Sequence, residues 1–145
     1  MIANFMTEDH RKCDENFGYI EELIEGKVYD LADKDFKKWK LGMENHLDKE
    51  EKYLFLKAEE KFGGPVGPIM VMKMEHQQMR DIFSRMENAI NEKDSNTFLG
   101  LAESCMILIQ QHNMKEEQIL YPMIDRALAD QANEVIGNLQ DGQFT

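Results

Sequence analysis

The stretch HNMKEEQILYP, from His112 to Pro122, repeats a phrase that occurs earlier in the chain. HLDKEEKYLFL, from His46 to Leu56, shares with it the pattern His-x-x-Lys-Glu-Glu-x-x-Leu. His112 lies 66 positions after His46, and His76 lies the same 66 positions after His10. All four histidines therefore fall on one internal repeat, in which each half reads His, 35 residues, His, three residues, Glu.

The segments that carry the repeat have the composition and punctuation of helices. Glu, Lys, Leu and Met are abundant, and the chain has only three prolines. We predict helices over about 4–25, 33–62, 68–93 and 95–121, with GGPVGP (63–68) as the strongest breaker. Asp33 and either Asp94 or Ser95 are the expected caps, Pro68 suits a first turn, and Pro122 should kink or end the last helix.

The expected fold is therefore all-α: an up-down-up-down antiparallel four-helix bundle with a short C-terminal helical tail. The two repeats predict two helical hairpins, at about 4–62 and 68–121, followed by a tail over 122–145. Together they should form a single domain over 1–145, since 145 residues with 42% hydrophobic content suit one core.

Charge and composition exclude several classes of function. A formal net charge of −11 makes direct nucleic-acid binding unfavourable. The sequence shows neither a membrane-spanning apolar run nor a signal peptide. Two cysteines are too few for a disulfide scaffold. We expect a cytoplasmic protein that does not associate with membranes and keeps its thiols reduced.

The repeated spacing predicts a metal site in the middle of the bundle. Residues four apart share a helix face, so His46 points with Glu50 and His112 points with Glu116. With His10 and His76 on the other two helices, four imidazoles and two carboxylates converge. This donor set suits iron, manganese or zinc. If each metal takes two histidines and both glutamates bridge, a bridging oxide or hydroxide makes five donors and leaves a sixth position for a small molecule.

The same geometry predicts the layers on either side of the site. Phe17, Trp39, Phe83 and Cys105 should form a mostly apolar lid, and the opposite layer should contain Met6, Tyr53, Met72 and Ile119. A dry pocket of this kind favours an uncharged diatomic ligand over a bulky polar substrate.

Several residues near the site allow more than one interpretation. Each motif ends in Glu-Glu, so Glu51 or Glu117 could replace Glu50 or Glu116, but the shared-face spacing favours the first glutamate of each pair. Lys49, Glu51, Lys115 and Glu117 are otherwise expected on a solvated helix face. Cys13 and Cys105 are expected as small buried apolar residues, and a role for Cys105 in the pocket stays open.

These residues resemble the hemerythrin-like (HHE cation-binding) domain over about 2–125. The resemblance rests on His10, His46-x3-Glu50, His76 and His112-x3-Glu116 with the KEExxLYP continuation. It implies a four-helix bundle with two iron ions in an oxo- or hydroxo-bridged centre, ligated by these six residues. The pattern is closer to the symmetric four-histidine type than to the oxygen carriers, which have a further histidine where this chain has Met72.

Three classes of function are compatible with such a site. The first is binding of oxygen or nitric oxide for sensing, scavenging or storage, with a protein partner if the chain is a sensor. The second is repair of iron centres, or reduction of nitric oxide or peroxide, at the same di-iron site. The third is a bundle without iron, in which zinc occupies the site or the chain serves as a metal-free interaction module.

Overall fold

The computed structural model describes residues 1–142, and these residues form helices and short connections without any strand. The α-helices are α1 (Ile2–Asp14), α2 (Phe17–Glu25), α3 (Tyr29–Lys49), α4 (Phe55–Phe62), α5 (Gly67–Asn91), α6 (Ser95–Lys115), α7 (Tyr121–Ala127) and α8 (Ala132–Asp141). The π-helical turns η1 (Glu50–Leu54) and η2 (Glu116–Leu120) and the short 3₁₀ turn η3 (Ala129–Gln131) complete the set.

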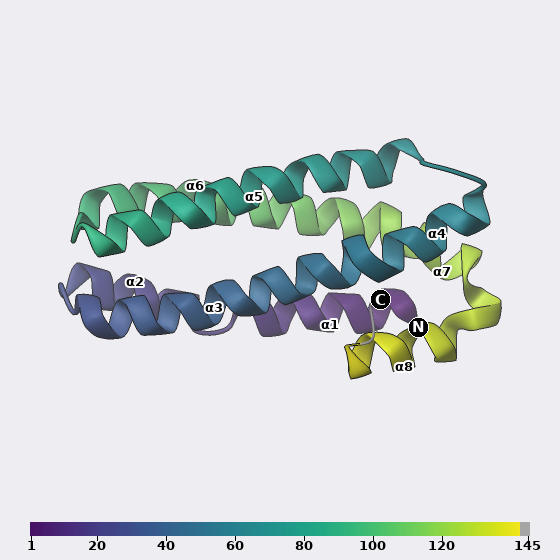
Figure 1. Cartoon of the computed structure of the whole chain (residues 1–145), viewed down its shortest axis with the longest axis horizontal. Coiled ribbons are helices and arrows are strands. Elements are labelled where there is room, and N and C mark those ends of the chain that lie inside the picture. Colours follow the sequence, from purple (N-terminus) through teal and green to yellow (C-terminus); the bar gives the residue numbers. More distant parts are fainter. Residues whose placement is uncertain (143–145) are drawn as a thin grey trace.

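These elements form four long antiparallel rods and a short C-terminal helix, as the sequence predicted (Figure 1). The first rod is α1 with α2, and the second is α3, η1 and α4 in one line. The third is α5, and the fourth is α6, η2 and α7. The tail helix α8 lies beside the start of α1, close to the N-terminus (Figure 1).

Two of the predicted helix starts are confirmed and one is wrong. Asp94 caps α6 by accepting a hydrogen bond from the backbone N–H of Thr97, and Pro68 lies in the first turn of α5. The second rod, however, begins at Tyr29 and not near Asp33. The turn before it is tight, because Lys27 adopts a positive φ of 58° and the next backbone N–H bonds back into α2. The chain therefore re-enters a helix four residues earlier than expected.

The first rod is interrupted where a continuous helix over 4–25 was predicted. Asn16 adopts a left-handed conformation with φ of 70°, which asparagine tolerates better than most residues. Helix α1 therefore ends at Asp14, and α2 restarts at Phe17 with its ring buried.

The two π turns occupy the same place in each repeat, directly after the His-x3-Glu spacing. Each turn adds one residue to the helical circuit and shifts the face that the following residues present. Ile119 was expected in the inner layer but is 56% exposed, and Leu120 is buried in its place. The turn also accommodates Pro122 in the first turn of α7, so the helix continues to Ala127 instead of ending at the proline.

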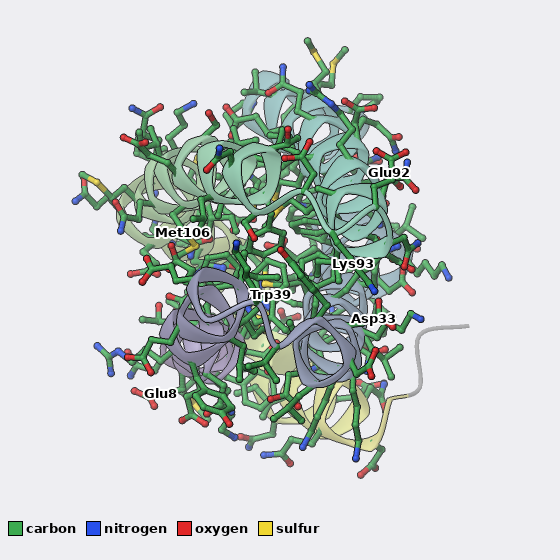
Figure 2. The ribbon with its side chains drawn as sticks, turned by 90° about the vertical axis from the view of Figure 1, so that its left-hand side faces the viewer. Glu8, Asp33, Trp39, Glu92, Lys93 and Met106 are labelled. Carbon is green, nitrogen blue, oxygen red and sulfur yellow. The ribbon has the colours of Figure 1, made fainter. Side chains whose placement is uncertain are left out.

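The core consists of two apolar clusters, one on each side of the histidines. The first cluster contains the predicted lid, in which the Trp39 ring packs 4.8 Å from Phe17 and 5.2 Å from Phe83, with Cys105 buried beside them. Seen from the end of the bundle, Trp39 lies among the rods, whereas Glu8 and Glu92 lie outside (Figure 2). The second cluster contains Met6, Tyr53 and Met72 from the other predicted layer.

The tail is attached to the second cluster. Val135 and Leu139 of α8 are buried, and Asn138 donates a 2.8 Å hydrogen bond to the Tyr53 hydroxyl. Asp125 of α7 accepts hydrogen bonds from the backbone N–H groups of Ile2 and Ala3, which satisfies the first turn of α1. Within residues 1–142, every helix is too short or too polar to cross a membrane.

Candidate metal centre

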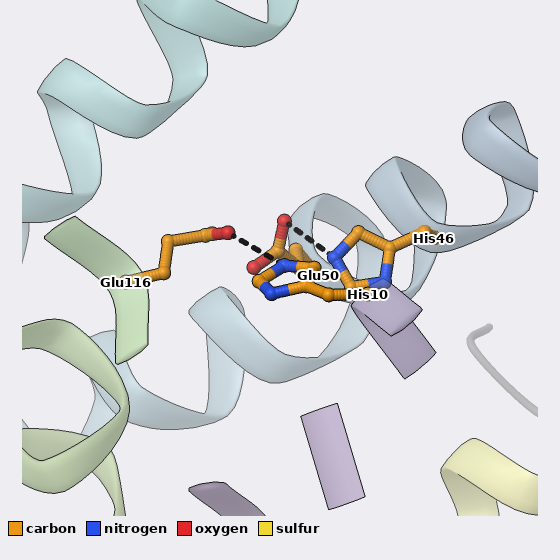
Figure 3. Close-up of side chains that lie close together, drawn as sticks. All are labelled: His10, His46, Glu50 and Glu116. Atoms are coloured by element: carbon orange, nitrogen blue, oxygen red, sulfur yellow. Dashed lines mark hydrogen bonds and ion pairs between the residues drawn. The ribbon is translucent and has the colours of Figure 1, made fainter. Parts of the chain in front are cut away.

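The four rods each contribute one histidine to the middle of the bundle. His10 comes from α1, His46 from α3, His76 from α5 and His112 from α6. All four are at most 4% exposed, and the carboxylates of Glu50 and Glu116, at the starts of the two π turns, are 0% exposed. Figure 3 shows His10, His46, Glu50 and Glu116 converging from three of the rods. The structure thus brings together all six residues that the sequence singled out.

The six side chains form two overlapping groups that share both glutamates. One group is His10, His46, Glu50 and Glu116, and the other is His76, His112 and the same two glutamates. Within each group, one donor atom from every residue lies within 4.8 Å of all the others. Both Glu50 and Glu116 therefore lie between two pairs of histidines, the arrangement expected of a two-metal site.

Each glutamate faces histidines of both groups through one oxygen. The Oε1 atom of Glu50 lies 3.1 Å from His76 Nε2 and 3.6 Å from His46 Nε2. The Oε1 atom of Glu116 lies 3.0 Å from His10 Nε2 and 3.1 Å from His112 Nε2. All four Nε2 atoms therefore point inward, toward the shared carboxylates.

The outward nitrogen of every histidine contacts a further carboxylate. His10 Nδ1 lies 2.7 Å from Glu117, and its repeat counterpart His76 Nδ1 lies 2.6 Å from Glu51. Lys49, Glu51, Lys115 and Glu117 were expected on a solvated face, and that interpretation is wrong for these two glutamates. The π turns carry them over the histidine of the opposite hairpin. A carboxylate on Nδ1 fixes the tautomer that leaves Nε2 free as a ligand.

The two remaining histidines are supported from within their own hairpins. His46 Nδ1 lies 2.7 Å from Asp9, and His112 Nδ1 lies 2.8 Å from Glu75. Asp9 and Glu75 directly precede His10 and His76 and are counterparts in the repeat. The repeat places acidic residues at both positions, so the sequence contained a signal for these contacts. Neither Asp9 nor Glu75 was predicted from the sequence as part of the site.

Three of these supporting carboxylates form ion pairs with Lys or Arg side chains. Lys49 and Lys115 form ion pairs with the two acidic residues that precede the histidines, Asp9 and Glu75. Arg80 donates to Glu51 at 3.1 Å and also binds Glu44 at 3.0 Å. These contacts hold the carboxylates in place and favour their charged forms.

Several buried polar atoms of the site form no well-directed hydrogen bond with the described residues, although some lie within ion-pair distance of one another. They are the Nε2 atoms of His46, His76 and His112, together with Glu50 Oε1 and Glu116 Oε2. Buried polar atoms are rarely left without partners, because each one costs desolvation free energy. Nitrogen and carboxylate oxygen donors that converge without partners fit a pair of bound cations.

The buried carboxylates raise the pKa of two of the site's histidines. Burial lowers the pKa of His10, but the hydrogen bond and charge of Glu116 outweigh this and raise it to about 9. His76 behaves alike, because burial is outweighed by the neighbouring carboxylates of Glu50 and Glu51 and its pKa also rises to about 9. Burial and the charge of Glu116 raise the pKa of Glu50. Without a metal, the buried carboxylates are therefore compensated by protons.

Tyr121 is a member of the site that the spacing argument did not identify. Its fully buried hydroxyl donates to Glu50 Oε2 at 2.8 Å and lies 3.0 Å from His10 Nε2. Its ring stacks on His10 at 5.5 Å, and the repeat counterpart Phe55 stacks on His76 at 6.0 Å. The signal was the replacement of Phe55 by Tyr121 at corresponding positions of the repeated phrase.

Neither cysteine belongs to the two groups that share Glu50 and Glu116, but Cys13 forms a third candidate group with Asp9 and His46. Cys105 is fully buried in the apolar lid, and burial raises the pKa of its thiol to about 12. Cys13 donates a 3.6 Å hydrogen bond to the Gly42 carbonyl, and burial, with the charge of Asp9, raises its pKa to about 12. Both are therefore neutral thiols near neutral pH.

The family follows from a comparison of the whole chain. The family model described as the hemerythrin HHE cation binding domain matches residues 1–124, which contain all six converging residues. The chain therefore belongs to the hemerythrin HHE cation-binding family, and its buried His/Glu groups are the candidate cation site. Comparisons with curated proteins and with solved structures gave no match.

Proposed function

We propose that the six converging residues bind two iron ions and that the loaded protein binds a small diatomic ligand, oxygen or nitric oxide. The observation that carries the proposal is the pair of overlapping donor groups, in which five buried nitrogen and oxygen atoms form no hydrogen bond with the described residues. One ion would be held by His10 and His46, the other by His76 and His112, and both by Glu50 and Glu116.

The chemistry of the donors supports iron. Imidazole nitrogen and carboxylate oxygen are ligands for divalent and trivalent iron, and the two groups that share Glu50 and Glu116 contain no cysteine. The four carboxylates on the outer nitrogens would make the imidazoles better donors and hold their rings in position. Iron of this kind supplies redox chemistry and affinity for small uncharged molecules.

The surroundings support a small ligand. The lid on one side and the second apolar cluster on the other surround the donors with apolar side chains. With four protein donors to each ion, coordination positions remain for a bridging oxygen atom and a ligand. An uncharged diatomic molecule crosses such layers more easily than a charged substrate does.

The first experiment measures metal content per chain with an optical spectrum, on protein purified without oxygen and then exposed to it. About two irons per chain are expected from the two donor groups, with a near-ultraviolet oxo-to-iron band that grows on exposure. Near-zero iron, or zinc without the band, would contradict the proposal. Glu50→Gln replaces one of the proposed ligands. The matched control is Glu44→Gln in the same rod, since Glu44 is half-buried but contacts no histidine in the described structure.

A reversible spectral change on adding oxygen or nitric oxide to the reduced protein would support ligand binding. The alternative, reduction of nitric oxide or peroxide or repair of iron centres, would use the same six residues. Steady turnover with a reductant, or transfer of iron to an acceptor protein, would favour that alternative over reversible binding.

A further inference from the structure

Among the side chains that contact the two central glutamates, the two halves of the site differ at one polar atom. The repeat places Tyr121 over His10 and Phe55 over His76, so only the first half contains a hydroxyl. That hydroxyl lies within 3.2 Å of Glu116 Oε1 as well as within hydrogen-bond distance of Glu50 and His10. It therefore occupies space next to the donors of the His10/His46 group.

The Tyr121 hydroxyl also contacts different oxygen atoms of the two shared glutamates. Glu50 Oε2 accepts the 2.8 Å hydrogen bond from Tyr121, so this carboxylate is held through its second oxygen. The corresponding second oxygen of Glu116 is buried and has no partner among the described residues. Tyr121 therefore contacts Glu50 through its Oε2 atom and Glu116 through its Oε1 atom.

A surface cavity lies on the half that lacks the hydroxyl. It has a volume of about 270 Å³ and lies between α5 and η2. Met72, four residues before His76, and Leu120, four residues after Glu116, are its buried residues. Val71 and Ile119 are exposed at 42% and 56% and form its rim. The remaining lining residues are Pro68 and Lys115.

The corresponding place in the first hairpin is filled. The repeat counterpart of Val71 is Phe5, whose ring lies 5.9 Å below the Lys49 amine, and the counterpart of Pro68 is Ile2, which is 0% exposed. The counterpart of Ile119 is Tyr53, which is 7% exposed and whose hydroxyl is bonded to Asn138 of α8. The tail helix thus covers one of two related positions and leaves the other open.

Given the proposed di-iron function, we infer that Tyr121 makes the two metal positions inequivalent and that the diatomic ligand binds at the His76/His112 position, which it reaches through the cavity beside Met72 and Leu120. Two independent observations favour the His76/His112 position as the place where the ligand binds. The Tyr121 hydroxyl obstructs the His10/His46 group, and the apolar cavity opens beside the other group. Tyr121 is a positioning residue, acting through Glu50.

Inequivalence is tested by the Mössbauer spectrum of the diferric protein loaded with ⁵⁷Fe. We expect two quadrupole doublets of equal area in the wild type and convergence toward one doublet in Tyr121→Phe. The double variant Phe55→Tyr/Tyr121→Phe moves the hydroxyl to the other half and should restore two doublets. A single doublet in the wild type, or two unchanged doublets in Tyr121→Phe, would overturn the inference.

The route is tested by stopped-flow binding of nitric oxide to the diferrous protein. Ile119→Trp fills the rim of the cavity and should slow association by about tenfold, equivalent to ~1.4 kcal/mol added to the barrier. The matched control is Ile107→Trp, also exposed (51%) and on the same rod but away from the cavity, which should bind at the wild-type rate. Equal rates in the two variants would overturn the route.

The proposed binding of iron and the assignment of the ligand to the His76/His112 half are contradicted by different results. A wild-type protein that binds no iron contradicts the proposed function itself. A protein that binds two irons but shows equivalent positions, or no effect of Ile119→Trp, contradicts only the assignment of the ligand to the His76/His112 half.

Discussion

Replacing Glu51 by Gln tests whether the outer carboxylates tune the metal site. Glu51 Oε2 accepts a 2.6 Å hydrogen bond from His76 Nδ1 and also binds Arg80. Glutamine has nearly the same shape and can still accept that hydrogen bond, so the substitution removes the charge and little else. Glu51→Gln is therefore expected to weaken metal binding at the His76/His112 position and to leave the His10/His46 position close to its wild-type affinity.

The expected magnitude follows from the contacts. Loss of a supporting partner on a ligating histidine typically costs about 10–100-fold in metal affinity, or ~1.4–2.7 kcal/mol. Since the substituted glutamine would keep the hydrogen bond, and since Glu51 is 22% exposed so that water screens part of its charge, we expect the lower limit, about tenfold.

The assay is a competition titration of the metal-free protein with Co²⁺ against a chelator, resolving the two binding steps. Glu44→Gln is the matched control, because Glu44 binds Arg80 at 3.0 Å but contacts no histidine in the described structure. Its affinities should equal those of the wild type. If Glu51→Gln and Glu44→Gln behave alike, the reasoning about the outer carboxylates is refuted.

Three further predictions concern stability. The metal-free protein should lose stability as the pH rises from 6.5 to about 9. The raised pKa values of His10 and His76 contribute stability that is complete below pH 6.5 and disappears above pH 9. Urea unfolding with a chelator present measures the free energy of unfolding, and a rise in stability over that pH range would contradict the prediction. Asp94→Ala removes the α6 cap and should cost about 1 kcal/mol in the same assay, whereas no loss would show the cap to be dispensable. Phe36→Ala, at a fully buried position, should cost ~3–5 kcal/mol against less than about 0.5 for Leu41→Ala, which is 64% exposed, and similar losses would argue against the described core.

Much of the fold could be predicted because its signals are local. The breaker at 63–68 and the cap at Asp94 mark helix ends through backbone chemistry, and both helix ends lie close to where they were expected. The π turns could not be predicted, because helical periodicity assumes a constant 3.6 residues per turn. Ile119 is exposed, whereas its repeat counterpart Tyr53, in the same kind of turn, is buried under the tail helix α8, and a helix-face argument includes neither the turn nor the tail. The break at Asn16 depends on a single left-handed residue, which composition does not reveal.

The central donors were predictable because the repeat and the His-x3-Glu spacing select one helix face. The outer carboxylates were harder to predict, because Glu51 and Glu117 reach histidines of the opposite hairpin. Their contacts depend on the packing between rods and on the π turn, neither of which appears in a helix-face argument. Tyr121 lies five residues beyond Glu116, where the same turn changes the direction of the side chain.

The crossing of these contacts between hairpins has a consequence for partly folded chains. His10 and His76 each depend on a glutamate from the other hairpin, and each donor group also includes one central glutamate from the other hairpin. A chain that opens between its hairpins, during synthesis or by thermal opening, loses part of both groups in the same event. Iron held by the six proposed ligands would therefore be taken up and released by the whole bundle, and a half-assembled chain would have no intact pocket in which to carry a loosely held, redox-active ion.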